Sequence, residues 1–321
     1  MAMARIHQYA LQGGITKTPE FEKKTLASFA VNVGTKCGHD CRYCSTGAML
    51  RMHRSFKEHG EDPFGFGYAI VDPATPDRVA RDARRIGRRG MIQLCTVVDA
   101  WSPEAQTHNL GRRCLEAILA EPGWTVRILT KNAAVERDFD LIGNHRDRVL
   151  VGLSITALLA KEGAIGVLEP GASRISERMS VLDEAARRGL RTYAMFCPLL
   201  PGISDSPEQV DELVRFAVSV KAEEIFVEPV NPRGPGLRLC QEALASAGYG
   251  AEAEAIAGIR KQDAWSRYVL ALLRCVQESV RRHSDIARLR FLLYPGRLLP
   301  EHVEQIRHDA AGVIWLEKAA R

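Results

Sequence analysis

The apolar positions of this chain follow two alternating spacings. Between six short runs rich in β-branched residues, apolar residues recur at helical spacing in segments 76–86, 103–119, 135–143, 174–188 and 207–220. Strands and helices in alternation form parallel sheets through right-handed crossovers. The pattern predicts an α/β fold, and its six repeats favour a partial (β/α)6 TIM-like barrel over a doubly wound sheet. The predicted strands are 28–33, 91–98, 126–130, 149–155, 192–197 and 224–230.

The pattern changes after residue 230. A Pro/Gly loop at 231–236 leads into an Ala/Gly/Glu-rich stretch that ends near Gly258, and an amphipathic helix follows at 263–283. Two apolar runs, 290–294 and 313–316, flank a further helix that starts near Pro300. We therefore predict an N-terminal segment (1–27), a barrel (28–230) and a C-terminal α/β extension (231–321) that serves as a substrate cap.

Composition narrows the class of protein. A chain of 321 residues that is 46% hydrophobic buries a sizeable core, and its formal charge of +5 falls short of a nucleic-acid-binding footprint. No window holds the roughly 18 apolar residues of a membrane span, and the start lacks a signal-peptide core. We expect a cytoplasmic protein with no membrane partner. In that reducing compartment its eight cysteines are ligands, reactive thiols or core residues rather than disulfides.

Three of the cysteines form a compact motif. Cys37, Cys41 and Cys44 are spaced C-x3-C-x2-C directly after the first predicted strand, and sites in α/β folds gather at that end of the strands. Three thiolates on a short loop can hold three irons of a [4Fe–4S] cluster and leave the fourth iron open. The alternative is a zinc knuckle, which needs a fourth ligand, and His39 is constrained by its neighbours in the loop. The spacing favours the iron–sulfur cluster.

The motif, with Tyr43 before its last cysteine, resembles the signature of the radical S-adenosylmethionine (SAM) superfamily. The resemblance covers about residues 28 to 230. It implies a cluster at Cys37, Cys41 and Cys44, SAM on the open iron, and Tyr43 beside the adenine. Reduction by a donor such as flavodoxin or ferredoxin then cleaves SAM, and the 5′-deoxyadenosyl radical abstracts hydrogen from a substrate.

Further fragments resemble the spore photoproduct lyase-like branch of that superfamily. The Gly-Gly-Glu-like segment of most members is replaced by a Cys-Thr segment that leads to Asp99. This resemblance implies that Lys131 and Ser154 bind the SAM carboxylate and that Asp99 binds its amino group or ribose. An ammonium and a hydroxyl suit a carboxylate, although Lys131 at a strand end could instead point into solvent. The other matching fragments are Glu169-Pro170 with Arg174 and Arg178, and 198–205.

Cys95 is the catalytic candidate that the resemblance implies. In spore photoproduct lyases a cysteine returns a hydrogen atom to the product radical, and Cys95 precedes Asp99 in a similar context. The alternative is a small buried core residue, and alternation along the strand decides which face the thiol occupies. The remaining cysteines are interpreted as structural, with Cys240 in reserve near the barrel mouth. They are Cys114, Cys197, Cys240 and Cys275.

The substrate stays open between two classes. Basic clusters at 51–57 and 81–89 and the aromatic residues Phe64, Phe66 and Tyr68 suit a nucleic acid, whose bases they would stack on. The same charges can be a solvated face, and the aromatic residues can pack the loop. The first hypothesis is therefore repair or modification of a nucleic-acid base. The second is modification of a peptide or small metabolite, and a third is a non-catalytic iron–sulfur or zinc protein.

Overall fold

The computed structural model describes residues 5–316 as a mixed α/β fold. All six predicted strands form, most of them one to three residues shorter than their apolar runs. They are β3 (Phe29–Val31), β6 (Met91–Leu94), β7 (Thr125–Thr130), β8 (Val149–Leu153), β10 (Ala194–Leu199) and β11 (Ile225–Pro229).

The parallel strands lie in two sheets. One has the order β2-β3-β6-β7-β8-β9, in which β2 (Thr16–Lys17) is antiparallel and β9 is Arg191–Thr192; the other has the order β10-β11-β12-β13. A single parallel bridge joins Ser154, after β8, to Met195 of β10. Within residues 5–316 the sheets close into no barrel. The partial (β/α)6 barrel stays a prediction.

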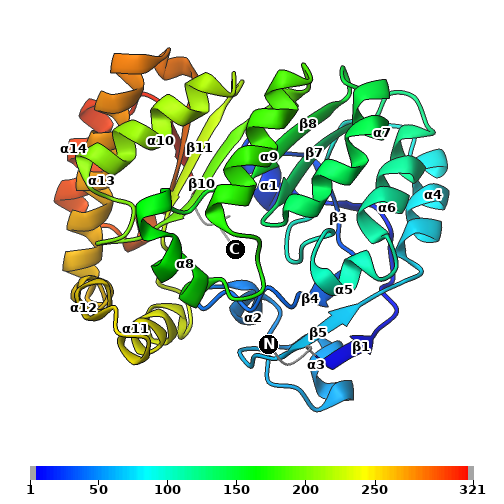
Figure 1. Ribbon diagram of the computed structural model, residues 1–321, viewed down its shortest axis with the longest axis horizontal. Helices are drawn as coiled ribbons and strands as arrows, with labels where there is room; N and C mark the ends of the chain where they lie inside the picture. Colours follow the sequence, from blue (N-terminus) through cyan, green and yellow to red (C-terminus); the bar gives the residue numbers. More distant parts are fainter. Residues whose placement is uncertain (1–4, 317–321) are drawn as a thin grey trace.

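The C-terminal extension contributes to the second sheet. Its two apolar runs form β12 (Leu289–Leu293), which pairs with β11 in parallel, and β13 (Val313–Trp315), which pairs with β12. Figure 1 shows its helices on the side of the molecule opposite α4 and α6. These are α11 (Gly236–Ser246), α12 (Gly250–Gly258), α13 (Gln262–His283) and α14 (Pro300–His308).

A small third sheet surrounds the approach to the cysteine motif, and the apolar pattern does not predict it. It has the order β1-β5-β4, with β1 at Arg5–Gln8, β4 at Gly34–Lys36 and β5 at Tyr68–Val71. Strand β4 separates β3 from Cys37, so the motif does not follow the first parallel strand directly. Figure 1 shows this sheet and α3 (Arg54–His59) below the large strands.

The helices between the strands match the periodicity, with one break. The predicted helix at 103–119 divides into α5 (Pro103–Gln106) and α6 (Leu110–Leu119) because Asn109 adopts a left-handed conformation with φ 52°. No helix within the described residues is long and apolar enough to cross a membrane. The other helices are α1 (Pro19–Lys23), α2 (Thr46–Met49), α4 (Thr75–Arg85), α7 (Phe139–Asn144), α8 (Glu162–Leu168), α9 (Ile175–Arg187) and α10 (Pro207–Ser219).

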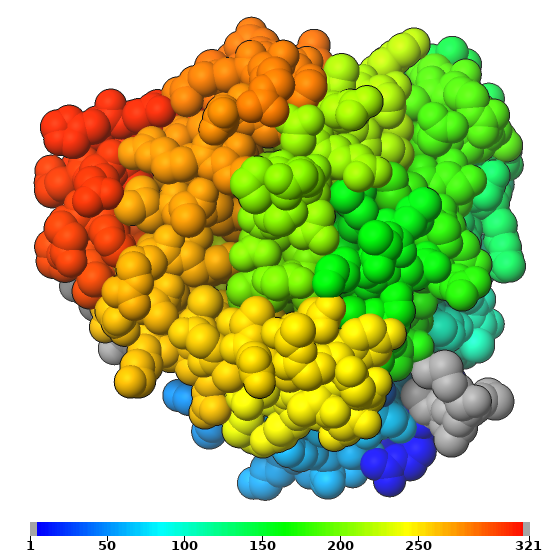
Figure 2. All heavy atoms as spheres, turned by 60° about the vertical axis from the view of Figure 1, so that its left-hand side comes forward, coloured from blue at the N-terminus to red at the C-terminus, as the bar shows by residue number. Residues whose placement is uncertain are grey.

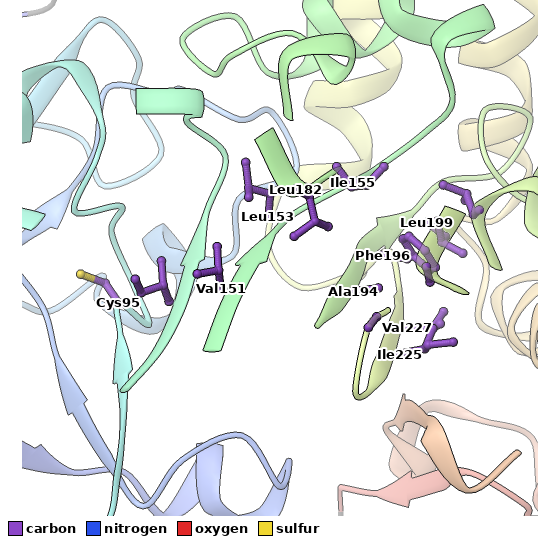
Figure 3. Close-up of a cluster of buried hydrophobic side chains, with 14 of the residues drawn as sticks. Cys95, Val151, Leu153, Ile155, Leu182, Ala194, Phe196, Leu199, Ile225 and Val227 are labelled. Atoms are coloured by element: carbon purple, nitrogen blue, oxygen red, sulfur yellow. The ribbon is translucent and has the colours of Figure 1, made fainter. Parts of the chain in front are cut away.

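Alternation along the strands divides the hydrophobic core into two parts. The larger part, here called the outer core, lies between the strands and the helices, where Phe196 of β10 meets helix residues such as Leu182 (Figure 3). The inner core uses the alternate positions, among them Met195 of β10 and Phe226 of β11. Functional side chains at the carboxyl ends of the strands are therefore sorted by the face that they occupy.

Candidate active site

The cysteine loop is fastened to two other connections of the fold. Backbone hydrogen bonds tie it to the segment between α8 and α9, and the buried carboxylate of Glu104 on α5 holds its start. Ser102 in turn donates to Glu104 at 2.6 Å. The three anchoring bonds join Gly38 N to Glu104 Oε1 (2.8 Å), Gly171 N to His39 O (3.0 Å) and Arg42 N to Leu168 O (2.8 Å).

Gly171 is required at one of these contacts. A Cβ at this position would lie 2.1 Å from the carbonyl oxygen of Gly38, which no side chain can satisfy without moving backbone. The close approach therefore depends on a residue without a side chain.

The three motif thiols differ in access. Cys44 is exposed, whereas Cys37 and Cys41 are half-buried. Burial raises the pKa of Cys37, and the neighbouring Glu104 carboxylate raises it further. Burial likewise raises the pKa of Cys41, to which Glu169 contributes. These thiols stay protonated until a metal displaces the protons.

The donor set suits a cluster better than a single zinc ion. Within residues 5–316 no three His, Cys, Asp or Glu side chains converge as ligands of one ion. Zinc needs such convergence, whereas the thiolates of a cubane each hold a different iron. The buried Nε2 of His39, inside the loop, also has no hydrogen-bond partner among the described residues. A loop with three thiols and a spare polar atom fits a [4Fe–4S] cluster.

The structure brings Lys131, Ser154 and Tyr43 together next to this loop. Lys131 Nζ donates to Ser154 Oγ at 2.6 Å and lies 5.8 Å from the centre of the Tyr43 ring. Lys131 directly follows β7 and Ser154 directly follows β8, so neighbouring parallel strands present both at one edge. The solvent-facing alternative for Lys131 is wrong, because its side chain is about five-sixths buried, with 16% exposed.

A buried ion pair lies behind these three residues. Glu169 pairs with Arg178, and it accepts hydrogen bonds from Tyr43 and from Thr156. Burial acts to raise the pKa of Glu169, but the charges of Arg178 and Lys131 outweigh it and lower the pKa below its ordinary value. Burial raises the pKa of Tyr43, so its hydroxyl stays a donor to this carboxylate.

Asp99 organises the ends of β6 and β7. Its carboxylate accepts from the Thr130 hydroxyl at 2.8 Å and from the backbone N–H groups of Trp101 (2.9 Å) and Lys131 (2.8 Å). His39 Nδ1 lies 3.5 Å from the same carboxylate. The structure therefore places Asp99 where it links the cysteine loop to Lys131. Its predicted contact with SAM stays a prediction.

Cys95 lies just beyond β6, where strand alternation no longer applies. The structure places it in the outer core with 3% of its surface exposed (Figure 3), and Cys114 of α6 and Asp99 are its ionisable neighbours. Burial raises the pKa of its thiol. Cys95 therefore matches the small buried residue that was its alternative interpretation, and its catalytic role stays a prediction.

The candidate substrate contacts separate by exposure. Arg51, Arg54 and Lys57 are exposed on and beside α3, and Arg54 lines a hollow of about 750 Å³ together with residues of the N-terminal segment. Tyr68 is 1% exposed in β5, and Phe66 packs under the Arg42 guanidinium at 3.9 Å. The packing interpretation of the aromatic run is therefore confirmed for Tyr68.

Periodicity could not identify several of these residues. Glu169 and Arg178 occur in a fragment noted in the sequence, but nothing in the sequence assigns them a buried pair. The backbone anchors of the cysteine loop carry no sequence signal, since an N–H or C=O is present at almost every position.

The radical SAM superfamily model matches residues 31–217, more than half of the chain. An uncharacterised protein of Acidianus two-tailed virus is 22% identical over 74% of this chain and 76% of its own length. An uncharacterised protein of Mycobacterium tuberculosis H37Rv is 23% identical over 71% of this chain, which spans 66% of that protein.

Solved structures of spore photoproduct lyase share the fold. A point mutant has a TM-score of 0.56 and 15% identity, with 87% of this chain and 78% of that chain covered. Another mutant, solved with a dinucleoside spore photoproduct, has a TM-score of 0.50 and 17% identity, over 75% of this chain and 66% of that one. At such identities the likeness concerns the fold alone.

Proposed function

The chain belongs to the radical SAM superfamily, whose enzymes use a [4Fe–4S] cluster and SAM and need an electron donor, and from this we propose a division of labour among its residues. Cys37, Cys41 and Cys44 hold three irons, and SAM completes the fourth. When bound, the cluster supplies the electron that cleaves SAM to methionine and a 5′-deoxyadenosyl radical. We place the enzyme in the cytoplasm, with flavodoxin or ferredoxin as donor.

The remaining site residues position SAM. The Lys131 ammonium and the Ser154 hydroxyl bind the carboxylate, because both are donors and already lie 2.6 Å apart. The Tyr43 ring, fixed by the hydrogen bond from its hydroxyl to Glu169, lies against the adenine. Asp99 binds the amino group or ribose and keeps Lys131 in register through the Lys131 backbone N–H.

The convergence of Lys131, Ser154 and Tyr43 beside the cysteine loop is the observation that carries this proposal. Its test is anaerobic reconstitution with iron and sulfide, reduction with dithionite in the presence of SAM, and assay of 5′-deoxyadenosine. Wild type is expected to form it, and a variant with Cys37, Cys41 and Cys44 all replaced by Ala is expected to form none. Uptake of zinc without a cluster would refute the proposal.

For the substrate we propose a nucleic-acid base. The exposed Arg51, Arg54 and Lys57 beside the cysteine loop are suited to phosphates, and Arg54 borders a hollow large enough for a nucleotide. Modification of a peptide or small metabolite is the second candidate, favoured by the modest net charge of +5. The two differ in whether nucleic acid binds with salt-dependent affinity.

The start of the C-terminal extension is the proposed substrate cap. A Cβ at Gly236 would lie 3.3 Å from the Cα of Tyr43, so the 231–236 loop passes directly over the motif. Helices α11 and α12 continue from it and cover α8 (Figure 2), where Glu252 forms an ion pair with Lys161 at 2.7 Å. An element that rests on both Tyr43 and α8 can limit access to the site.

A further inference from the structure

A cluster of four polar side chains occupies the inner face at the carboxyl ends of β10, β11 and β12. The Cys197 thiol donates to Glu228 Oε2 at 3.4 Å, and the Tyr294 hydroxyl donates to Glu228 Oε1 at 2.8 Å. Lys24, which follows α1, has its Nζ 3.5 Å from the same carboxylate. Four different segments of the chain therefore meet at one carboxylate on the inner face.

This cluster is continuous with the proposed SAM site. Lys131 Nζ donates to the backbone carbonyl of Cys197 at 3.2 Å, and Ser154 Oγ donates to the same oxygen at 2.7 Å. The two residues assigned to the SAM carboxylate therefore contact the residue that carries the thiol. A SAM-derived radical would form within reach of this part of the inner face.

Among the cysteines outside the motif, Cys197 alone combines access with this position. Cys95, Cys114 and Cys240 are buried in the outer core, and Cys275 lies on α13, outside the sheets. Cys197 is half-buried and packs against the inner core. Its alternation partner Phe196 points to the outer core, which explains why neighbouring residues of β10 differ so much in surroundings.

Resting on the proposed function, we propose that the Cys197 thiol is the hydrogen-atom donor of the reaction, with Glu228 as the residue that positions it. The 5′-deoxyadenosyl radical takes a hydrogen atom from a substrate C–H bond and becomes 5′-deoxyadenosine. After the substrate radical has rearranged, the product radical takes the hydrogen atom of the Cys197 S–H bond and leaves a thiyl radical. One electron from the low-potential donor that also reduces the cluster, and one proton from solvent, restore the thiol.

The surroundings keep the donor in the form that this step needs. Burial raises the pKa of Cys197, and the Glu228 carboxylate raises it further. The group therefore stays S–H rather than thiolate at neutral pH, and only S–H carries a hydrogen atom to give. Lys24 balances the negative charge of Glu228, so the carboxylate can remain beside the thiol.

The test needs only SAM as probe. The reconstituted enzyme is equilibrated in D2O, so that thiols become S–D, and is reduced with dithionite and SAM without substrate. A radical that forms beside Cys197 is then quenched by this thiol and gives monodeuterated 5′-deoxyadenosine. Mass spectrometry measures the deuterated fraction in wild type, Cys197→Ser, Cys95→Ser and Cys275→Ser, with iron content and circular dichroism as controls of folding.

Cys197→Ser is expected to lose most of the deuterium while it still forms 5′-deoxyadenosine, because a hydroxyl hydrogen is held far more strongly than a thiol hydrogen. Cys275→Ser is expected to match wild type. Equal deuteration in Cys197→Ser and wild type would overturn the proposal, as would loss of deuterium in Cys95→Ser alone. If wild type forms no 5′-deoxyadenosine, the proposed function itself fails, and this inference with it.

Discussion

At the scale of single residues, the site depends on a few buried charges that compensate one another. Lys131 shares its ammonium among Ser154 Oγ, the Cys197 carbonyl and, at 3.9 Å, the Glu169 carboxylate. Glu169 is 3% exposed and balances Arg178. Removing one member of such a set leaves its partner uncompensated, which costs more than the pair itself contributes.

Replacing Lys131 by Ala is expected to weaken SAM binding by roughly tenfold, the loss of one charge-assisted hydrogen bond worth about 1.5 kcal/mol. Isothermal titration calorimetry on the reconstituted protein measures the affinity. Lys161→Ala is the matched control, because its ammonium pairs with Glu252 away from the motif. Unaltered affinity in Lys131→Ala would remove this residue from the SAM site.

Replacing Glu169 by Gln is expected to destabilise the fold by roughly 3–5 kcal/mol, because the buried Arg178 loses its counter-charge. Urea unfolding at pH 7 measures this. The lowered pKa of Glu169 also sets the sign with pH. The stability that its carboxylate contributes is fully present above the ordinary value of 4.5 and is lost as the pH falls through the lower folded pKa.

The same pair of proteins tests that sign. Between pH 7 and pH 3 the difference in unfolding free energy between wild type and Glu169→Gln should shrink. A difference that stays constant or grows on acidification would show that the folded pKa is not lowered.

At the scale of elements, the cysteine loop is positioned by segments distant in sequence. The connection from α8 to α9 approaches so closely that Gly171 touches the Gly38 carbonyl, and Glu104 of α5 holds the other side. The short strand β4 delivers Cys37 from the small sheet rather than from β3. The loop is thus a product of three connections, and its geometry is sensitive to each.

Gly171→Ala is expected to reduce cluster content on reconstitution, because its Cβ would displace the backbone at Gly38. Iron and sulfide analysis and the visible absorbance of the cluster measure this. Gly166→Ala is the matched control, since a Cβ there meets nothing within 4 Å and α8 gains about 0.5–1 kcal/mol from the better helix former. Equal cluster content in both variants would contradict the role given to this contact.

At the scale of the whole molecule, the two basic clusters lie on different elements and serve as controls for each other. Arg51, Arg54 and Lys57 are exposed near the motif. Arg81, Arg84 and Arg85 are exposed on α4, whose buried Asp82 instead fastens the N-terminal segment through Gly14 N at 2.9 Å. Only the first cluster is placed to reach a substrate at the site.

Replacing Arg51, Arg54 and Lys57 by Gln is expected to weaken nucleic-acid binding and to flatten its dependence on log salt concentration by up to about 0.9 per lost phosphate contact on duplex DNA. Fluorescence anisotropy across a salt series measures both. The Gln variants of Arg81, Arg84 and Arg85 should behave as wild type. Salt-independent affinity in wild type would favour the peptide or metabolite alternative.

The sequence by itself determined the six strands, most of the helices and the chemistry of the cysteine motif. Periodicity and ligand spacing are local properties, and burial of an alternating apolar pattern leaves them little freedom. Lys131 and Ser154 were also predictable in position, since residues that follow neighbouring parallel strands must share an edge.

The tertiary structure alone decided which residues meet. That β12 and β13 extend the second sheet depends on long-range pairing, and that Glu169 neutralises Arg178 depends on how α8 and α9 pack. The two thiols show the reason most clearly. Cys95 and Cys197 both stand in apolar strand-like runs, yet β6 ends before Cys95, which turns into the outer core, while β10 continues past Cys197 and holds it on the inner face.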